Sequence, residues 1–159
     1  MSKNDYKTVF FLLKHTDVSP NYRYRGIGAL SIAIENDNKK MVELLLKNGV
    51  RPLLEGTRSS DNSLIVATIY NKYDIVEILI NFGMNINRVD DDNSTPLRYA
   101  CKNNNIRIVK LLLRNGADPN IAAQNGSTPL SEAIVFKNKE LIDLLLQHGA
   151  KTSGERGSE

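Results

Sequence analysis

Apolar residues in this chain fall into pairs of short clusters, one narrow and one broad, separated by polar turns. In residues 94–120, Leu97, Ala100 and Cys101 lie at i, i+3 and i+4, which is the spacing of one helical face. Three asparagines interrupt the pattern, and a broader cluster, Ile108–Leu113, follows them. The pattern predicts two short helices joined by a polar turn.

Local signals mark both ends of this predicted helix pair. Thr95 and Pro96 precede the first apolar cluster. A hydroxyl there can accept from an orphan amide, and proline is tolerated at the first helical position because that amide has no intrahelical partner. Gly116 follows the second cluster, and glycine closes helices by adopting the left-handed conformation at little cost.

The same pattern returns along the chain at intervals of 34, 33 and 33 residues. Leucines, alanines and glycines share this phase: Leu30, Leu64, Leu97 and Leu130; Ala33, Ala67, Ala100 and Ala133; Gly49, Gly83, Gly116 and Gly149. A fixed period of this length predicts supersecondary units that stack on one another.

Two of the units also carry a specific motif. Thr95–Ala100 reads T-P-L-R-Y-A and Thr128–Ala133 reads T-P-L-S-E-A. Over roughly residues 22–150 the chain therefore resembles the ankyrin-repeat family, whose known period and T-P-L-H-x-A signature it matches. The resemblance implies an all-α solenoid of stacked helix-turn-helix units with projecting hairpin loops, or fingers.

Residues 1–150 are expected to form a single ankyrin-repeat domain, followed by a flexible polar tail at 151–159. The expected units are an N-terminal half repeat and four full repeats: 1–21, 22–55, 56–88, 89–122 and 123–150. Gly28–Ala29 replaces the Thr-Pro pair in the first full repeat, so that helix should begin more loosely. The loop at 50–63 is one residue longer than its counterparts, which predicts a bulge or a longer hairpin.

Composition adds little about partners but something about location. The chain has 159 residues, a net charge of +3 and a pI near 9.0, which is weak evidence for a polyanion partner. A lone cysteine fits a reducing compartment. The longest apolar run, Val9–Leu13, is too short to span a bilayer. These features predict a cytoplasmic protein. Abundant Asn, Lys and Ile suggest an AT-rich genome, so the host cell is the compartment if the source is an intracellular bacterium or a virus.

No constellation in the sequence indicates catalysis, a metal or a cofactor, and we expect none. His15 and His148 each precede a helix end, where a cation complements the helix dipole. Cys101 aligns with buried apolar positions and has no histidine in its own repeat. The triplet Asp90–Asp92 begins like a calcium loop but lacks the required Gly and Glu, and Gly26–Gly28 lacks the context of a phosphate loop.

In the ankyrin family, partners bind the concave surface made by the fingers and the first helix of each repeat. Carried over by alignment, the resemblance gives a candidate binding face in this chain. Its members are Tyr22, Arg23, Tyr24, Arg25, Arg58, Ile69, Tyr70, Asp90, Asp91, Asp92, Lys102, Gln124, Asn125, Val135 and Phe136. Exposed Tyr, Phe and Arg are the residue types that most often anchor interfaces.

Other interpretations of these residues stay open at this point. Tyr22 and Tyr24 can instead pack on the N-terminal half repeat. Arg58 can pair with Asp90 or Asp91 across adjacent fingers, a surface interaction worth about 0–1 kcal/mol. The aspartate triplet can be a solvated finger rather than a contact surface.

The sequence favours a non-catalytic protein-binding module, acting as an adaptor, an inhibitor or an effector. The alternative is the targeting segment of a larger enzyme or of a secreted, host-directed effector. Polyanion binding through Arg23, Arg25 and Arg58 is a weaker hypothesis, because the aspartate triplet interrupts any phosphate track. The last predicted helix is as apolar as an internal one. Three explanations stay open: the natural protein continues, the chain self-associates through the C-terminal repeat, or it tolerates an exposed apolar edge.

Overall fold

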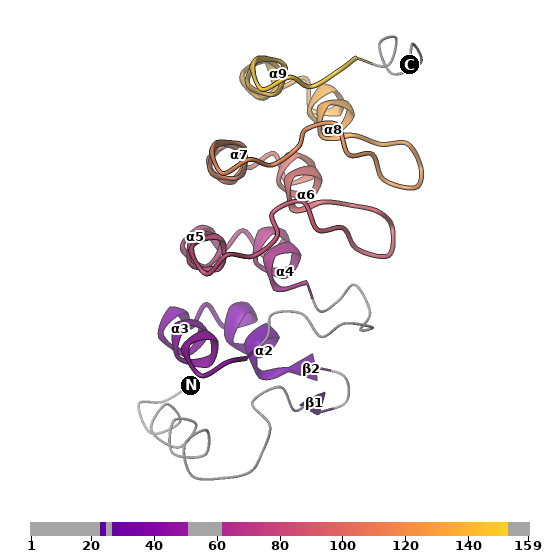
Figure 1. Cartoon of the computed structure of the whole chain (residues 1–159). Coiled ribbons are helices and arrows are strands. Elements are labelled where there is room, and N and C mark those ends of the chain that lie inside the picture. The colour runs from indigo at the N-terminus through magenta and orange to yellow at the C-terminus, as the bar shows by residue number, and fades with distance from the viewer. Residues whose placement is uncertain (1–22, 25–26, 51–61, 153–159) are drawn as a thin grey trace.

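The computed structural model describes residues 23–24, 27–50 and 62–152 (Figure 1). Within these ranges the helices follow one another in pairs: α2 (Ala29–Glu35) and α3 (Lys39–Lys47), α4 (Ser63–Ile69) and α5 (Tyr73–Asn81), α6 (Pro96–Lys102) and α7 (Ile106–Arg114), α8 (Pro129–Val135) and α9 (Lys139–Gln147). Two short strands precede them and pair antiparallel: β1 (Arg23–Tyr24) and β2 (Ile27–Gly28). The described fold is therefore built from helical pairs.

The helices form two columns (Figure 1). The first helix of each pair packs on its own partner and on the first helix of the next pair, from α2 to α8. We call α2, α4, α6 and α8 the inner helices, and α3, α5, α7 and α9 the outer helices. The described loops between pairs, from α5 to α6 and from α7 to α8, project as fingers from the side of the inner helices (Figure 1). This arrangement confirms the predicted all-α solenoid of stacked helix pairs.

The inner helices begin where the sequence predicts. Thr95 and Thr128 are the N-caps of α6 and α8; each side-chain oxygen accepts from the backbone N–H three residues later, and a proline follows each cap. Asn62 makes the same bond for α4, where the Thr-Pro pair is absent. Losing such a cap typically costs about 1 kcal/mol.

Each turn between paired helices contains one residue in the left-handed region, followed by the N-cap of the outer helix. The left-handed residues are Asp37, Asn71, Asn104 and Lys137, with φ of 54°, 56°, 52° and 51°. Asp and Asn enter this region more easily than other residues with a Cβ, so lysine at 137 is the most strained of the four. The N-caps are Asn38, Lys72, Asn105 and Asn138, and only the asparagines accept a capping bond through their side chains.

Asparagine side chains also join the bases of successive fingers. Asn87 Nδ2 donates to Gly116 O at 3.3 Å, and Asn87 Oδ1 accepts from the Asp118 backbone N–H at 2.8 Å. Asn120 makes the same two bonds to the backbone of the next segment, at 2.9 and 2.8 Å. Because each amide satisfies one donor and one acceptor of its neighbour, the spacing between repeats is held by polar contacts as well as by packing.

The core runs continuously through the stack. Leu64, Leu97 and Leu130 are buried in one cluster together with the alanines of the inner helices and the large apolar residues of the outer helices. Small alanines let the helices approach closely, and the larger side chains fill the space between layers. The predicted shared interior is confirmed for the described repeats.

The last described repeat leaves apolar positions exposed that earlier repeats bury. Ile134 is 55% exposed, whereas Cys101, one repeat earlier, is 0% exposed. Leu146 is 43% exposed, whereas Leu113 at the equivalent position is 5% exposed. A further described repeat follows Cys101 and Leu113, whereas none follows Ile134 and Leu146. We call Ile134 and Leu146 the C-terminal face.

Several expectations lie outside the described residues. These are the half repeat at 1–21, the longer loop around 51–61 and the flexible tail from 153 onward. The division of the chain into one half repeat and four full repeats therefore stays a prediction.

Candidate functional site

The ends of the inner helices form a row of equivalent positions along the stack. The last helical residues are Glu35, Ile69, Lys102 and Val135, and the residues that follow them are Asn36, Tyr70, Asn103 and Phe136. We call these eight residues the inner-helix face. All eight are exposed. The sequence predicts partner binding for five of them: Ile69, Tyr70, Lys102, Val135 and Phe136.

Two apolar pairs stand out on the inner-helix face. Tyr70 and Phe136 are 50% and 48% exposed, and their neighbours Ile69 and Val135 are also among the most exposed large apolar side chains of the described chain. Isolated exposed apolar residues are ordinary, but adjacent pairs that recur in register on one face indicate an interaction surface. These pairs flank Lys102 and Asn103, so the row alternates between polar and apolar chemistry.

Asn103 fixes the backbone beside the first apolar pair. Its Nδ2 donates to Ile69 O at 3.1 Å and to Thr68 O at 3.3 Å. The Ile69 carbonyl lies at the C-terminal end of α4, where helices leave carbonyls without intrahelical partners, whereas Thr68 O also accepts from the Asn71 backbone N–H. Ile69 and Tyr70 are consequently presented from a backbone held by the next repeat, which lowers the entropy lost when a partner binds.

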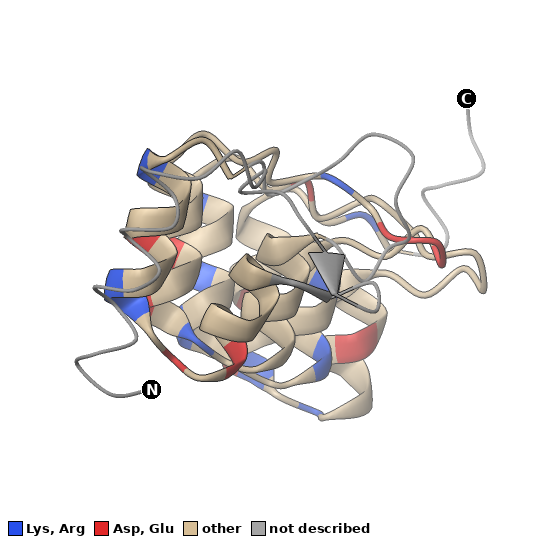
Figure 2. Ribbon diagram, turned by 90° about the horizontal axis from the view of Figure 1, so that it is seen from below, with Lys and Arg blue, Asp and Glu red and all other residues tan. Residues whose placement is uncertain are grey.

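The third finger is organised around Asp90. Its Oδ1 accepts from the backbone N–H groups of Asp92 and Ser94 at 3.0 and 2.9 Å. Its Oδ2 accepts from the Tyr99 hydroxyl at 2.7 Å. Burial of the Tyr99 side chain, and to a lesser extent this hydrogen bond, raises the pKa of Tyr99 to about 12. Asp90 therefore shapes the finger, while Asp91 and Asp92 are exposed. Figure 2 shows acidic residues near the outer end of a finger.

The protonation of the Tyr99 hydroxyl makes the stability of the fold depend on alkaline pH. Because its pKa of about 12 in the fold lies above the ordinary value of 10.0, the folded state holds this proton more tightly than the unfolded state. The associated stabilisation is present below pH 10 and is lost as the pH rises toward 12.

The third and fourth fingers are hydrogen-bonded to each other. Gln124 donates from its backbone N–H to Asp92 O at 2.9 Å and from Nε2 to Asp91 O at 2.6 Å. Asn125 Oδ1 accepts from the Ser127 backbone N–H at 3.0 Å. The predicted binding residues Gln124 and Asn125 thus also hold the fingers in place.

One polar pocket of about 370 Å³ lies between these fingers and α6. It brings together four of the predicted binding residues: Asp92, Lys102, Gln124 and Asn125. Arg98 also lines it, and this residue was missed. The Arg98 Nη2 atom lies 2.7 Å from Glu132 Oε1, and Nη1 donates to Ser94 Oγ at 2.8 Å. This pair is largely buried, so it belongs to the base of the site.

The comparison with known proteins agrees with this architecture. The family model described as Ankyrin repeats (3 copies) matches residues 1–90 and 64–155. This chain belongs to the ankyrin-repeat family. An ankyrin repeat protein of fowlpox virus (strain NVSL), FPV014, is 36% identical over 97 residues. The match covers 60% of this chain, and it spans 22% of the length of that relative. Ankyrin repeats generally mediate protein–protein interactions, which makes a protein the expected partner class.

The outer column of this ankyrin-repeat chain carries charges that pair between repeats. Lys39 pairs with Asp74, and Lys110 Nζ lies 2.8 Å from Glu140 Oε1. The hydrogen bond from Lys39, with desolvation opposing it, lowers the pKa of Asp74. Arg107 lies over the Tyr73 ring, 3.7 Å from its centroid. These contacts tie the outer helices together.

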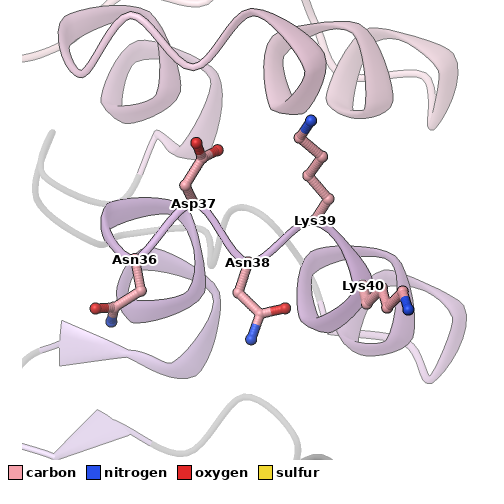
Figure 3. Close-up of a pocket in the computed structure, with 5 residues that line it drawn as sticks. All are labelled: Asn36, Asp37, Asn38, Lys39 and Lys40. Atoms are coloured by element: carbon pink, nitrogen blue, oxygen red, sulfur yellow. The ribbon is translucent and has the colours of Figure 1, made fainter. Parts of the chain in front are cut away.

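Another surface pocket, of about 390 Å³, lies at the turn between α2 and α3, where five consecutive residues line it: Asn36, Asp37, Asn38, Lys39 and Lys40 (Figure 3). Asp37 and Lys39 point toward the next repeat, away from Asn36 and Asn38 (Figure 3). Asp37 pairs there with Lys72 at 3.6 Å, and Lys39 pairs with Asp74. The charges of Asp37 and Lys39 therefore serve contacts between ankyrin repeats.

In the described repeats, the surroundings of Cys101 and His148 indicate structural rather than catalytic roles. Burial raises the pKa of the Cys101 thiol to about 12, so the nucleophilic thiolate is disfavoured. His148 Nδ1 lies 2.9 Å from Leu144 O at the end of α9, in line with its predicted role at a helix terminus. Over residues 23–24, 27–50 and 62–152, no group of three or more His, Cys, Asp or Glu side chains is placed to hold a metal ion. No helix in these ranges is both long and apolar enough to cross a membrane.

The remaining predicted binding residues are those of the first two fingers. Tyr22, Arg25 and Arg58 lie outside the described residues. Arg23 and Tyr24 form β1, but the placement of their side chains is not described. The suggested pairing of Arg58 with Asp90 or Asp91, and the suggested packing of Tyr22 and Tyr24, therefore stay predictions.

Proposed function

We propose that this ankyrin-repeat domain is a non-catalytic module that holds a protein partner against the inner-helix face. The observation that carries the proposal is the pair of exposed apolar sites, Ile69–Tyr70 and Val135–Phe136, on helices that α6 keeps in register. The fingers complete the surface through Asp91, Asp92, Gln124 and Asn125. The module acts as an adaptor, an inhibitor or an effector, with cytoplasm as the proposed compartment.

Replacing Tyr70 and Phe136 with alanine is expected to weaken partner capture at least tenfold. Aromatic anchors near the centre of an interface commonly contribute about 2 kcal/mol or more each. Their exposure in the free protein means that truncation should leave the melting temperature nearly unchanged. The measurement is quantitative pull-down from lysate of the relevant cells, with thermal unfolding measured in parallel.

Phe82→Ala is the matched control for this experiment. Phe82 is 45% exposed, close to Phe136, but it follows the outer helix α5. Proteins that are captured by wild type and by Phe82→Ala, and lost with Tyr70→Ala/Phe136→Ala, support the assigned face. Equal capture by all three variants would refute it.

A second candidate function is the targeting segment of a larger enzyme or of a host-directed effector. It is favoured by the fowlpox relative, of which the match spans only 22%, and by the viral setting of that relative. In this case the compartment is the host-cell cytoplasm. The intact mass of the native product distinguishes the two functions, because a mass equal to that of these 159 residues contradicts the larger enzyme.

We further propose that the chain self-associates through the C-terminal face. Ile134 and Leu146 expose apolar area at positions that earlier repeats bury, and a second copy can cover it. Ile134→Asp is expected to abolish the concentration dependence of the sedimentation coefficient. Val135→Asp, one residue away on the inner-helix face, should preserve it. A wild-type chain that sediments as a monomer at every concentration would rule out self-association.

A further inference from the structure

We propose that the partner segment on the inner-helix face carries an acidic residue between two apolar anchors. The inference rests on the proposed function and specifies the chemistry of the partner. It follows from the order of side chains along the stack, which is Ile69–Tyr70 on α4, then Lys102–Asn103 on α6, then Val135–Phe136 on α8.

The spacing of the anchors follows from helix packing. α4 contacts α6, and α6 contacts α8. Packed helix axes lie about 8–10 Å apart, so the two apolar pairs are separated by about 16–20 Å, with Lys102 near the midpoint. Such a span corresponds to about five or six residues of extended chain, or to about eleven to thirteen residues of helix.

Lys102 is a cation without an internal partner. Its side chain is exposed at the end of α6, and it forms no ion pair or hydrogen bond with any residue that the structure describes. By contrast, Arg98 and Lys110 pair with carboxylates of the next repeat. A partner that covers both apolar pairs must also cover Lys102, and burying an unpaired ammonium is unfavourable. An acidic residue at that point of the partner removes this cost.

The surroundings of Lys102 favour a carboxylate over a phosphate. Asp92 lines the same pocket, and the Arg98 guanidinium is already occupied by Glu132 and Ser94. Lys102, the available cation of this pocket, lies beside Asp92 and can balance a single negative charge on the partner. A doubly charged phosphate would meet repulsion from Asp92, and the described residues that line this pocket offer it no second available cation.

Selection from a phage-displayed library of random peptides about 16 residues long, enough for either conformation, tests the inference. The library is selected in parallel on wild type, on Lys102→Glu and on Lys139→Glu. Lys139 is an exposed lysine at the start of the outer helix α9, so it controls for net charge. Wild type and Lys139→Glu should enrich Asp or Glu between apolar residues. Lys102→Glu should enrich Lys or Arg there and should bind the best wild-type peptide about tenfold more weakly.

The outcomes separate this inference from the proposed function. Peptides that lose binding with Tyr70→Ala/Phe136→Ala but show no central acid overturn the inference and leave the proposed function standing. A phosphoserine at the central position that binds more than tenfold tighter than the carboxylate overturns the choice of charge. Failure to select any peptide, or selection of peptides insensitive to Tyr70→Ala/Phe136→Ala, overturns both.

Discussion

Replacing Leu113 with alanine is expected to lower the free energy of unfolding by about 3 kcal/mol, while Leu146→Ala should cost less than about 1 kcal/mol. The two leucines occupy equivalent positions of consecutive repeats and undergo the same chemical change. Leu113 is almost fully buried, whereas Leu146 keeps nearly half of its surface in water. The difference between the two variants therefore isolates the contribution of stacking from the intrinsic preference of leucine for a helix.

Urea denaturation of the two variants and of wild type, at a protein concentration at which the chain is monomeric, provides the measurement. Repeat proteins are stabilised by interfaces between neighbouring repeats, so the loss at Leu113 should lower the midpoint of a single cooperative transition. An equal loss in both variants would mean that burial by a following repeat contributes nothing measurable. That result would contradict the stacking account.

Glu132→Ala is expected to cost about 3 kcal/mol, because it leaves the guanidinium of Arg98 buried and unpaired. The Glu132 carboxylate lies 2.7 Å from Arg98, and both side chains are largely removed from water. The Nε of Arg98 already has no hydrogen-bond partner among the described residues. The guanidinium has few other ways to recover the lost interaction.

Glu140→Ala controls for the loss of a charge. Glu140 also pairs with a cation of the preceding repeat, Lys110, but both side chains are substantially exposed. Exposed pairs contribute about 0–1 kcal/mol, so this variant should be nearly as stable as wild type. The double variant Arg98→Leu/Glu132→Leu should recover much of the lost stability, since an apolar pair of similar volume removes the buried charge. A small effect of Glu132→Ala in urea denaturation would show that this contact is not a stabilising link between repeats.

The helical architecture could be predicted from the sequence because its determinants are local and repeated. Thr95 and Pro96 start a helix, Gly116 ends one, and the leucine and alanine positions fix which face is buried. These signals act within a few residues, so one repeat predicts the next. The exposure of Tyr70 and Phe136 also follows from their place in the repeat.

Other features of the site depend on contacts that the sequence alone does not specify. Arg98 and Glu132 are 34 residues apart, and either could have faced solvent. Asp90 sits in a run of three similar aspartates, and its contacts with the Tyr99 hydroxyl and with the backbone of the finger distinguish it as the residue that shapes the finger. The isolation of Lys102 emerges only when the partners of the other cations are known.

The most direct test of the central claim is hydrogen–deuterium exchange of the chain, measured with and without a captured protein partner. Added protection is expected at the C-terminal turns of α4, α6 and α8 and in the third and fourth fingers. The outer helices α5, α7 and α9 should exchange as they do in the free protein. Protection confined to the outer helices would place the partner on the opposite side of the stack and contradict the assigned binding face.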